Sequence, residues 1–177
     1  MQIFKKLLGY SLSILGISAA LFMSSCAPKN SCDTLQCKNG GTCAADFCNC
    51  PTGYDGPECQ NFIADRYIGT YAGYTDPRNG QPTHVDTVDV YLAQKPLSLS
   101  VVRRRQADAI FTGLLESKSN TINVPDIVNG NIRTIVNIAI KTPTSVSEER
   151  TLSLNLEQYT DGKKSSELFF NGVSVSK

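Results

Sequence analysis

The sequence predicts a mainly β protein, in which a small disulfide-rich module precedes an antiparallel β-meander that folds as a barrel or a sandwich of about eight strands. Two observations lead to this fold class. Six of the seven cysteines lie between Cys32 and Cys59. After Cys59 there is no further cysteine, and apolar residues alternate with polar ones in segments separated by glycine, proline and asparagine.

The first 25 residues have the three parts of a secretory signal peptide. Lys5 and Lys6 form a basic start, an apolar stretch without charge covers residues 7–23, and small residues precede Cys26. The pattern is similar to a bacterial lipoprotein signal, although Met23 stands where leucine is usual. We therefore expect cleavage before Cys26, acylation of Cys26 (palmitate included), and a short polar tether over residues 26–31.

Two alternatives to lipidation are an ordinary signal peptide that leaves Cys26 as a spare thiol, and a transmembrane anchor. An odd cysteine count in a secreted chain favours lipidation, because six cysteines belong to the module and Cys26 is left over. The resemblance to lipoproteins implies the bacterial cell envelope. Ala27 occupies the position where aspartate tends to retain lipoproteins on the inner membrane, so we expect the outer membrane, with the face left open.

Residues 32–59 are too few to bury a stabilising apolar core, so cross-links must hold this segment together. The spacing reads Cys32-x4-Cys37-x5-Cys43-x4-Cys48-x-Cys50-x8-Cys59. Six cysteines allow about 15 pairings, and spacing alone does not choose among them. Zinc is not expected, because zinc ligands pair as Cys-x2-4-Cys and a secreted chain favours oxidation.

With Asn39-Gly40-Gly41-Thr42 and Pro51-Thr52-Gly53-Tyr54-Asp55-Gly56 between the cysteines, the segment resembles an EGF-like domain. The resemblance implies three disulfides, Cys32–Cys43, Cys37–Cys48 and Cys50–Cys59, and a role as spacer or interaction module. It also implies that Tyr54 packs on the last disulfide loop. Only four residues separate Cys43 from Cys48, which predicts a short central hairpin, and no acidic residue precedes Cys32 to indicate calcium binding.

Residues 60–177 are predicted to be β-structure after one helical turn at 61–66. In the clearest segments alternate residues are apolar, as in Leu152, Leu154 and Leu156, which indicates strands with one buried face. Asp161-Gly162 and Asn129-Gly130 are typical hairpin turns, and residues 75–83 form a loop. The expected strands are 67–74, 85–93, 97–103, 109–116, 121–124, 132–142, 151–159 and 166–175.

Gly69-Thr70-Tyr71 after a helical turn resembles the first-strand motif of lipocalin-like barrels, without the tryptophan of that family. It is also similar to the β-domain that follows an EGF-like stretch in some bacterial lipoproteins. The lipocalin resemblance implies a carrier of a small apolar ligand. The large residues on the apolar faces instead favour a packed core.

Charge excludes nucleic acid as an expected partner. The chain has 17 basic and 16 acidic side chains, and removal of the leader with Lys5 and Lys6 leaves a net charge of −1. Arg103-Arg104-Arg105 is interpreted as a strand end or turn that meets water, with a local anion contact as the alternative. Asp86 and Asp89 are interpreted as residues of a polar outer face.

No enzyme, cofactor or metal site is expected. His84 is the one histidine, it lies at a loop-to-strand boundary, and no Gly-x-Ser-x-Gly, phosphate-loop or dinucleotide motif accompanies it. Tyr67, Tyr71, Tyr74 and Tyr91 are possible contact residues for a sugar or peptide. Tyr67 and Tyr71 share one face of a strand, and this favours the alternative that the tyrosines belong to the barrel core. The function expected is that of a lipid-anchored binding protein whose partner is an unknown protein, glycan or small apolar ligand.

Overall fold

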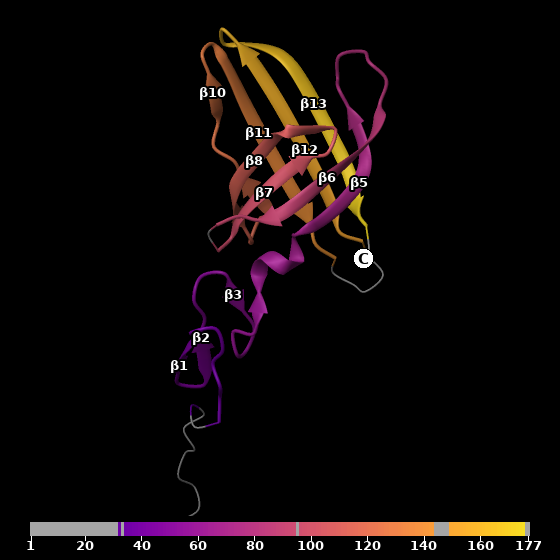
Figure 1. The fold of residues 1–177 in the computed structure, drawn as a ribbon. Helices are drawn as coiled ribbons and strands as arrows, with labels where there is room; N and C mark the ends of the chain where they lie inside the picture. The colour runs from indigo at the N-terminus through magenta and orange to yellow at the C-terminus, as the bar shows by residue number, and fades with distance from the viewer. Residues whose placement is uncertain (1–31, 33, 95, 144–148, 176–177) are drawn as a thin grey trace, which may run out of the picture.

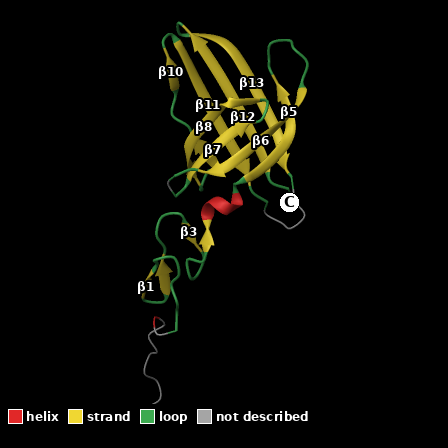
Figure 2. Ribbon diagram, viewed as in Figure 1, coloured by secondary structure: helices red, strands yellow, loops and turns green. Residues whose placement is uncertain are grey.

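The structure is a computed structural model that describes residues 32, 34–94, 96–143 and 149–175. The predicted signal peptide, Cys26 and the tether lie outside these residues. A small disulfide-linked module stands at one end of a β-barrel, and the two are joined by a short helical turn (Figure 1; Figure 2). The fold class predicted from the sequence is confirmed, and of the two predicted architectures, barrel and sandwich, the structure is the barrel.

The module consists of two short hairpins. Strands β1 (Thr42–Ala44) and β2 (Phe47–Asn49) pair with each other, as do β3 (Tyr54–Asp55) and β4 (Asn61–Phe62). The disulfides are the three that the EGF-like resemblance implies: Cys32–Cys43, Cys37–Cys48 and Cys50–Cys59. The ring of Tyr54, within the Cys50–Cys59 loop, packs against Phe62 with 5.2 Å between the ring centroids.

The module is fixed to the barrel at the barrel's closed end. The 3-10 helix η3 (Ile63–Arg66) follows β4, and the Ile63 N–H donates to the carbonyl of Gly53 at 2.9 Å. Gly53 has φ of +97°, and a Cβ placed on it would lie 3.0 Å from the Cβ of Pro96 in the barrel. Tyr67 then enters the barrel floor, where its hydroxyl donates to Asn120 at 2.7 Å. Gly53 and Tyr67 thus bring the module close to the barrel at this end.

The barrel strands form one antiparallel sheet that closes on itself. Its strands are β5 (Gly69–Asp76), β6 (His84–Leu92), β7 (Ser98–Arg103), β8 (Gln106–Glu116), β9 (Thr121–Asn123), β10 (Ile127–Asn129), β11 (Ile132–Lys141), β12 (Thr151–Thr160) and β13 (Lys163–Ser174). Each of β5 to β8 pairs with the next strand, β11 pairs with β12 and β12 with β13, and β13 returns to β5. Pairing of β9 with β11 completes an eight-stranded ring.

Strand β10 was not among the strands expected from the sequence. It continues β9 along the same side of β11 but has no second neighbour among the described strands. The sequence between them is Val124-Pro125-Asp126. Proline has no N–H to donate to a ladder, so pairing with β8 ends at Asn123. The wall therefore has an open seam between β10 and the first part of β8, and exposed Ile110 and Val128 lie beside it.

The interior is filled near the module and open at the other end. The closed end and middle of the barrel are packed with aliphatic and aromatic side chains: Tyr71, Val88, Val90, Leu99, Val101, Leu115, Ile122, Val136, Ile138, Ile140, Leu152, Leu154 and Phe170. Gly73 and Gly172 face each other across β5 and β13. The loops 77–83, 104–105 and 161–162 surround the open end, and Asp161-Gly162 forms the predicted hairpin turn.

Candidate functional site

The four tyrosines proposed as contacts are divided between the interior and the surface. Tyr67 and Tyr71 are buried, which confirms the favoured interpretation that they belong to the core and rules them out as surface contacts. Burial raises the pKa of Tyr71 to about 12, and its hydroxyl donates to the carbonyl of Tyr67 at 2.7 Å. Tyr74 and Tyr91 are exposed on the outer face, but the register places Tyr74 opposite Val85, six residues before Tyr91, so they do not form one aromatic surface.

Arg103 corrects the prediction that the whole arginine run meets water. Its side chain is 3% exposed, and its Nη2 donates to Asp86 at 2.8 Å. Asp86 also lies inside the barrel rather than on the predicted outer face, and it accepts from the Thr75 hydroxyl at 3.0 Å. Arg104 and Arg105 do form the predicted turn between β7 and β8.

The environment of Asp86 keeps its carboxyl ionised. Burial is the largest influence and pushes the pKa of Asp86 upward. Hydrogen bonds from Arg103, the Thr87 N–H and Thr75 together outweigh burial, so the pKa of Asp86 lies below its ordinary value. The result is a buried, ionised pair beneath the open end of the barrel.

A recess of about 330 Å³ occupies the open end above this pair. Phe111, Leu156 and Leu168 contribute apolar walls, while Arg103, Gln106 and Gln158 contribute polar groups. Arg103 Nη1 donates to Gln106 at 2.8 Å. Its Nε is buried and has no hydrogen-bond partner among the described residues, so the recess contains a donor available to a ligand or water.

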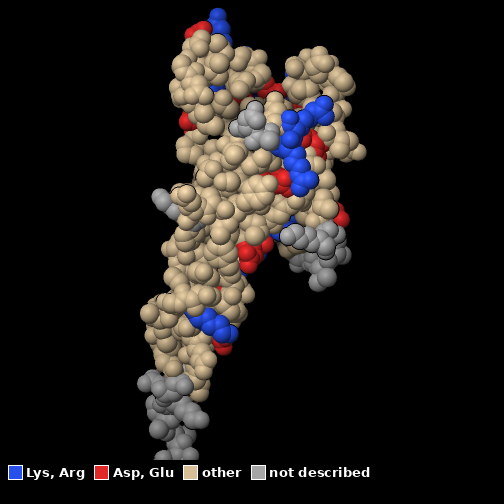
Figure 3. Space-filling model, viewed as in Figure 1, with Lys and Arg blue, Asp and Glu red and all other residues tan. Residues whose placement is uncertain are grey.

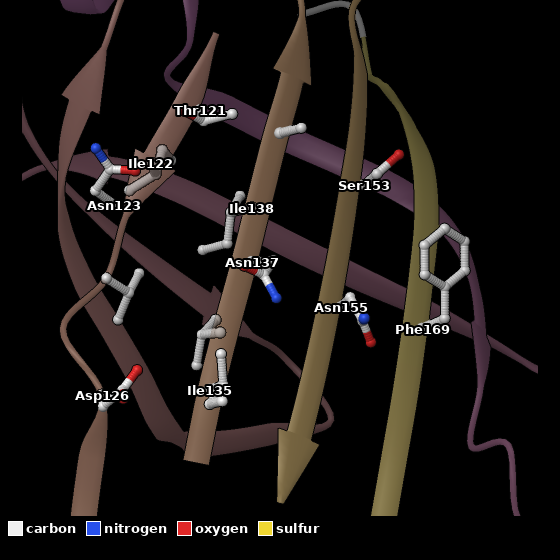
Figure 4. Close-up of a pocket in the computed structure, with 13 residues that line it drawn as sticks. Thr121, Ile122, Asn123, Asp126, Ile135, Asn137, Ile138, Ser153, Asn155 and Phe169 are labelled. Carbon is white, nitrogen blue, oxygen red and sulfur yellow. The ribbon is translucent and has the colours of Figure 1, made fainter. Parts of the chain in front are cut away.

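A second recess, of about 400 Å³, lies on the outer face of β9, β11, β12 and β13 (Figure 4). We call it the amide groove and define it by Asn123, Asn137, Ser153, Asn155 and Phe169. Figure 4 shows Asn137, Asn155 and Phe169 on three neighbouring strands. Alternation explains the arrangement, because Val136, Ile138 and Leu154 point into the core while their sequence neighbours point outward.

The strand register places the three amides of the groove in one row. Asn137 is opposite Asn123 on one side and opposite Asn155 on the other, and Asn155 is opposite Phe169. The Oδ1 of Asn155 is buried without a hydrogen-bond partner among the described residues. The guanidinium of Arg78 lies 5.8 Å from the centre of the Phe169 ring. The groove is not recognisable in the sequence, because its residues come from separate strands and match no local motif.

A third recess, of about 690 Å³, is lined in part by Tyr91, which the sequence offered as a contact residue. Arg104 lies beside it and donates to Asp89 at 2.6 Å, and Thr70 also donates to Asp89 at 2.6 Å. The hydrogen bond from Arg104 is the main reason why the pKa of Asp89 is lowered. On the face shown in Figure 3 charged side chains are sparse and occur in small groups of both signs.

Neither catalytic nor metal chemistry has a recognisable centre in the described part of the chain. No group of three or more histidine, cysteine, aspartate or glutamate residues is placed there to hold a metal ion. His84 begins β6 opposite Thr75, and its Nε2 is buried without a partner among the described residues. No helix in the described residues is long and apolar enough to cross a membrane.

Comparison with known proteins finds relatives of the module. The chain is 43% identical over 47 residues to fibropellin-1 of Strongylocentrotus purpuratus, which is 24% of this chain and 4% of that protein. It is 32% identical over 106 residues to cadherin EGF LAG seven-pass G-type receptor 2 of Rattus norvegicus, which is 54% of this chain and 4% of that protein. These matches and the three disulfides support an EGF-like module. No family profile and no solved structure matches the chain.

Proposed function

We propose that this protein is a lipid-anchored binding protein of the bacterial cell envelope, in which the EGF-like module is a spacer and the barrel is the recognition head. The proposal rests on the orientation of the barrel relative to the module. The module packs against the closed end, through Gly53, Pro96 and η3, so the open end points away from the N-terminal side. An anchor at Cys26 then leaves the open end and the outer grooves accessible.

Chemistry at the candidate sites supports binding rather than catalysis. The recesses offer hydrogen-bond donors, acceptors and apolar walls. The hydroxyls of Thr75 and Thr70 do donate to Asp86 and Asp89, but each of these carboxylates is also held by an arginine, Arg103 or Arg104. The disulfides suit an oxidising compartment outside the cytoplasm, in agreement with the secretory signal at the N-terminus.

The intact mass of the protein from its native membrane, before and after reduction, tests the anchor and its location. We expect a mature chain that begins at Cys26 with the mass of three acyl chains added, and six further hydrogens after reduction. The Cys26→Ser variant is the matched control and is expected to lack the acyl mass and to leave the membrane fraction. An unacylated wild-type chain would refute the lipid-anchored proposal.

A second candidate function, carriage of a small ligand, is favoured by the recess at the open end of the barrel. Its volume of about 330 Å³ falls at the low end of the range for small-molecule sites. The polar groups of Arg103, Gln106 and Gln158 mean that a purely apolar ligand would leave hydrogen-bonding groups unsatisfied. The ligand class that fits is amphipathic, with an acceptor near Arg103.

Anilinonaphthalene sulfonate is a suitable probe for carriage, because it combines aromatic rings with an acceptor group. We expect saturable fluorescence enhancement that is lost in Ala109→Phe, which fills the recess from β8, and retained in Ile110→Phe, whose side chain is exposed outside the barrel. Equal binding by both variants would exclude the recess as the site.

A further inference from the structure

We propose that the amide groove binds an uncharged oligosaccharide. This inference rests on the proposed function and names the class of partner that the recognition head receives. Three properties of the groove lead to it: the balance of charge, the type of hydrogen-bonding group, and the spacing of those groups across the sheet.

Charge in the groove is neutralised within the protein. Asp126 is the one lining residue with a formal charge, and its carboxylate accepts from Arg133 Nε at 2.8 Å. The guanidinium of Arg78, which lies beside Phe169, is paired in turn with Asp76 at 3.2 Å. The remaining polar lining residues are amides and hydroxyls, including Thr121 and Ser153. An anionic or cationic ligand would therefore lose hydration without gaining an opposite charge, whereas an uncharged ligand has no such cost.

The hydrogen-bonding groups match a polyol. An asparagine amide offers two donors and an acceptor, and each sugar hydroxyl is at once a donor and an acceptor. Asn123 and Asn137 have no side-chain hydrogen bond to another described residue, so their groups are available. The buried Oδ1 of Asn155 lacks a donor, and a ligand hydroxyl would supply one.

The spacing suits a short chain of sugar rings. Adjacent strands lie about 4.8 Å apart, so the row Asn123, Asn137, Asn155 presents amides at steps close to the length of one pyranose unit. Phe169 continues the row and gives a flat apolar surface, which is suited to the C–H face of a sugar ring.

An extended peptide fits the groove less well. Peptides that add to a sheet pair with a free strand edge. Beneath the row of amides, β11 is paired at Asn137 with both β9 and β12, and β12 is paired at Asn155 with both β11 and β13, so no backbone edge is free under the row. Recognition must come from side chains that project from the face of the sheet, and these are the neutral amides.

Isothermal titration calorimetry of the full-length protein against trisaccharides tests the inference. Maltotriose, cellotriose, mannotriose, galactotriose and chitotriose are the neutral probes, and trigalacturonate and the chitosan trimer are charged counterparts of the last two. We expect at least one neutral trisaccharide to bind at millimolar concentration or below, more tightly than either charged probe. Asn137→Ala and Phe169→Ala are each expected to weaken that binding at least tenfold, and the exposed Asn129→Ala outside the groove to leave it unchanged.

The possible failures are distinguishable. If no neutral trisaccharide binds, or if binding is the same in Asn137→Ala and Phe169→Ala as in the wild type, the groove does not hold such a ligand. If a charged trisaccharide binds the groove better than its neutral counterpart, the class of ligand is wrong. Neither result bears on the proposed lipid anchor, because the acyl mass at Cys26 tests that proposal separately. Unchanged circular dichroism of the variants verifies that they fold, which is expected because Asn137 is exposed.

Discussion

Removal of the Asp86 carboxylate is expected to destabilise the barrel more than removal of its partner Arg103. The side chains are 1% and 3% exposed, so either deletion leaves a group buried without its main partner. Deletion of one member of a buried ion pair typically costs about 3–5 kcal/mol. In Asp86→Ala the guanidinium retains only Gln106 and cannot lose its proton, so we expect a loss at the upper end of that range.

Arg103→Met is expected to cost less, because Asp86 keeps its hydrogen bonds from Thr75 and the Thr87 N–H and can also take up a proton. The double variant Asp86→Ala/Arg103→Met replaces the pair by apolar atoms. It should lose at least about 2 kcal/mol less than the sum of the single variants, as expected for two residues in direct contact.

The assay is urea unfolding with the disulfides intact, followed by circular dichroism and tyrosine fluorescence, since the chain has no tryptophan. Acidification gives an independent measurement. Because the pKa of Asp86 is lowered in the folded state, its contribution is present above its unfolded pKa and is lost as the pH falls through its folded pKa. The double variant should show a shallower acid decline. Additive single variants, or a loss below about 1 kcal/mol in Asp86→Ala, would refute this account.

Three further changes test the framework. Gly73→Ala would place a Cβ 2.0 Å from the Asn171 carbonyl oxygen, so we expect the free energy of unfolding, measured in urea, to fall by about 3 kcal/mol. Tyr74→Phe, at an exposed position, is the control and should change it little. A Gly73→Ala variant as stable as the wild type would contradict the tight β5–β13 contact. Tyr71 stays protonated in the fold up to about pH 12, so stability should fall between pH 10 and 12 as the unfolded chain ionises; Tyr71→Phe should reduce this fall, and an unchanged slope would argue against it. Cys50→Ser/Cys59→Ser should destabilise the module by about 2–5 kcal/mol, with amide exchange increased in the module and unchanged in β12; equal exchange throughout would show that the two parts unfold together.

Sequence alternation predicted the strands well because each buries one face. Leu152 and Leu154 occupy the core opposite Ile140 and Ile138, as their alternation predicted, and the alternating Val88 and Val90 of β6 are also buried. The same alternation also places Asp86 and Arg103 on buried strand faces, because Asp86 is two residues before Val88 and Arg103 is two residues after Val101. Polar residues on an apolar face indicate a buried pair, but their partnership depends on the β6–β7 register, which places Arg103 beside Val88.

The amide groove was not predictable from local sequence. Asn123, Asn137 and Asn155 are each an ordinary outward-facing strand residue, and their row exists only after three strands are aligned. Strand β10 was missed for a related reason, because Ile127–Asn129 is short and follows a proline. The EGF-like resemblance, in contrast, implied all three disulfides, because the cysteine spacing is itself local information.

Closure of the barrel depends on its shortest strand. β9 contributes three residues, each paired with β8 on one side and β11 on the other, whereas β11 and β12 are paired along ten residues. Thermal fluctuations should therefore break the pairings of β9 long before the long hairpins separate, and this briefly converts the closed barrel into a curved open sheet. Amide hydrogens of Ile122 and Asn123 should exchange ahead of those in β12. In that open form two strand edges would have unpaired backbone groups that a strand of another molecule could pair with. The pairings of β9 therefore also protect the protein from self-association.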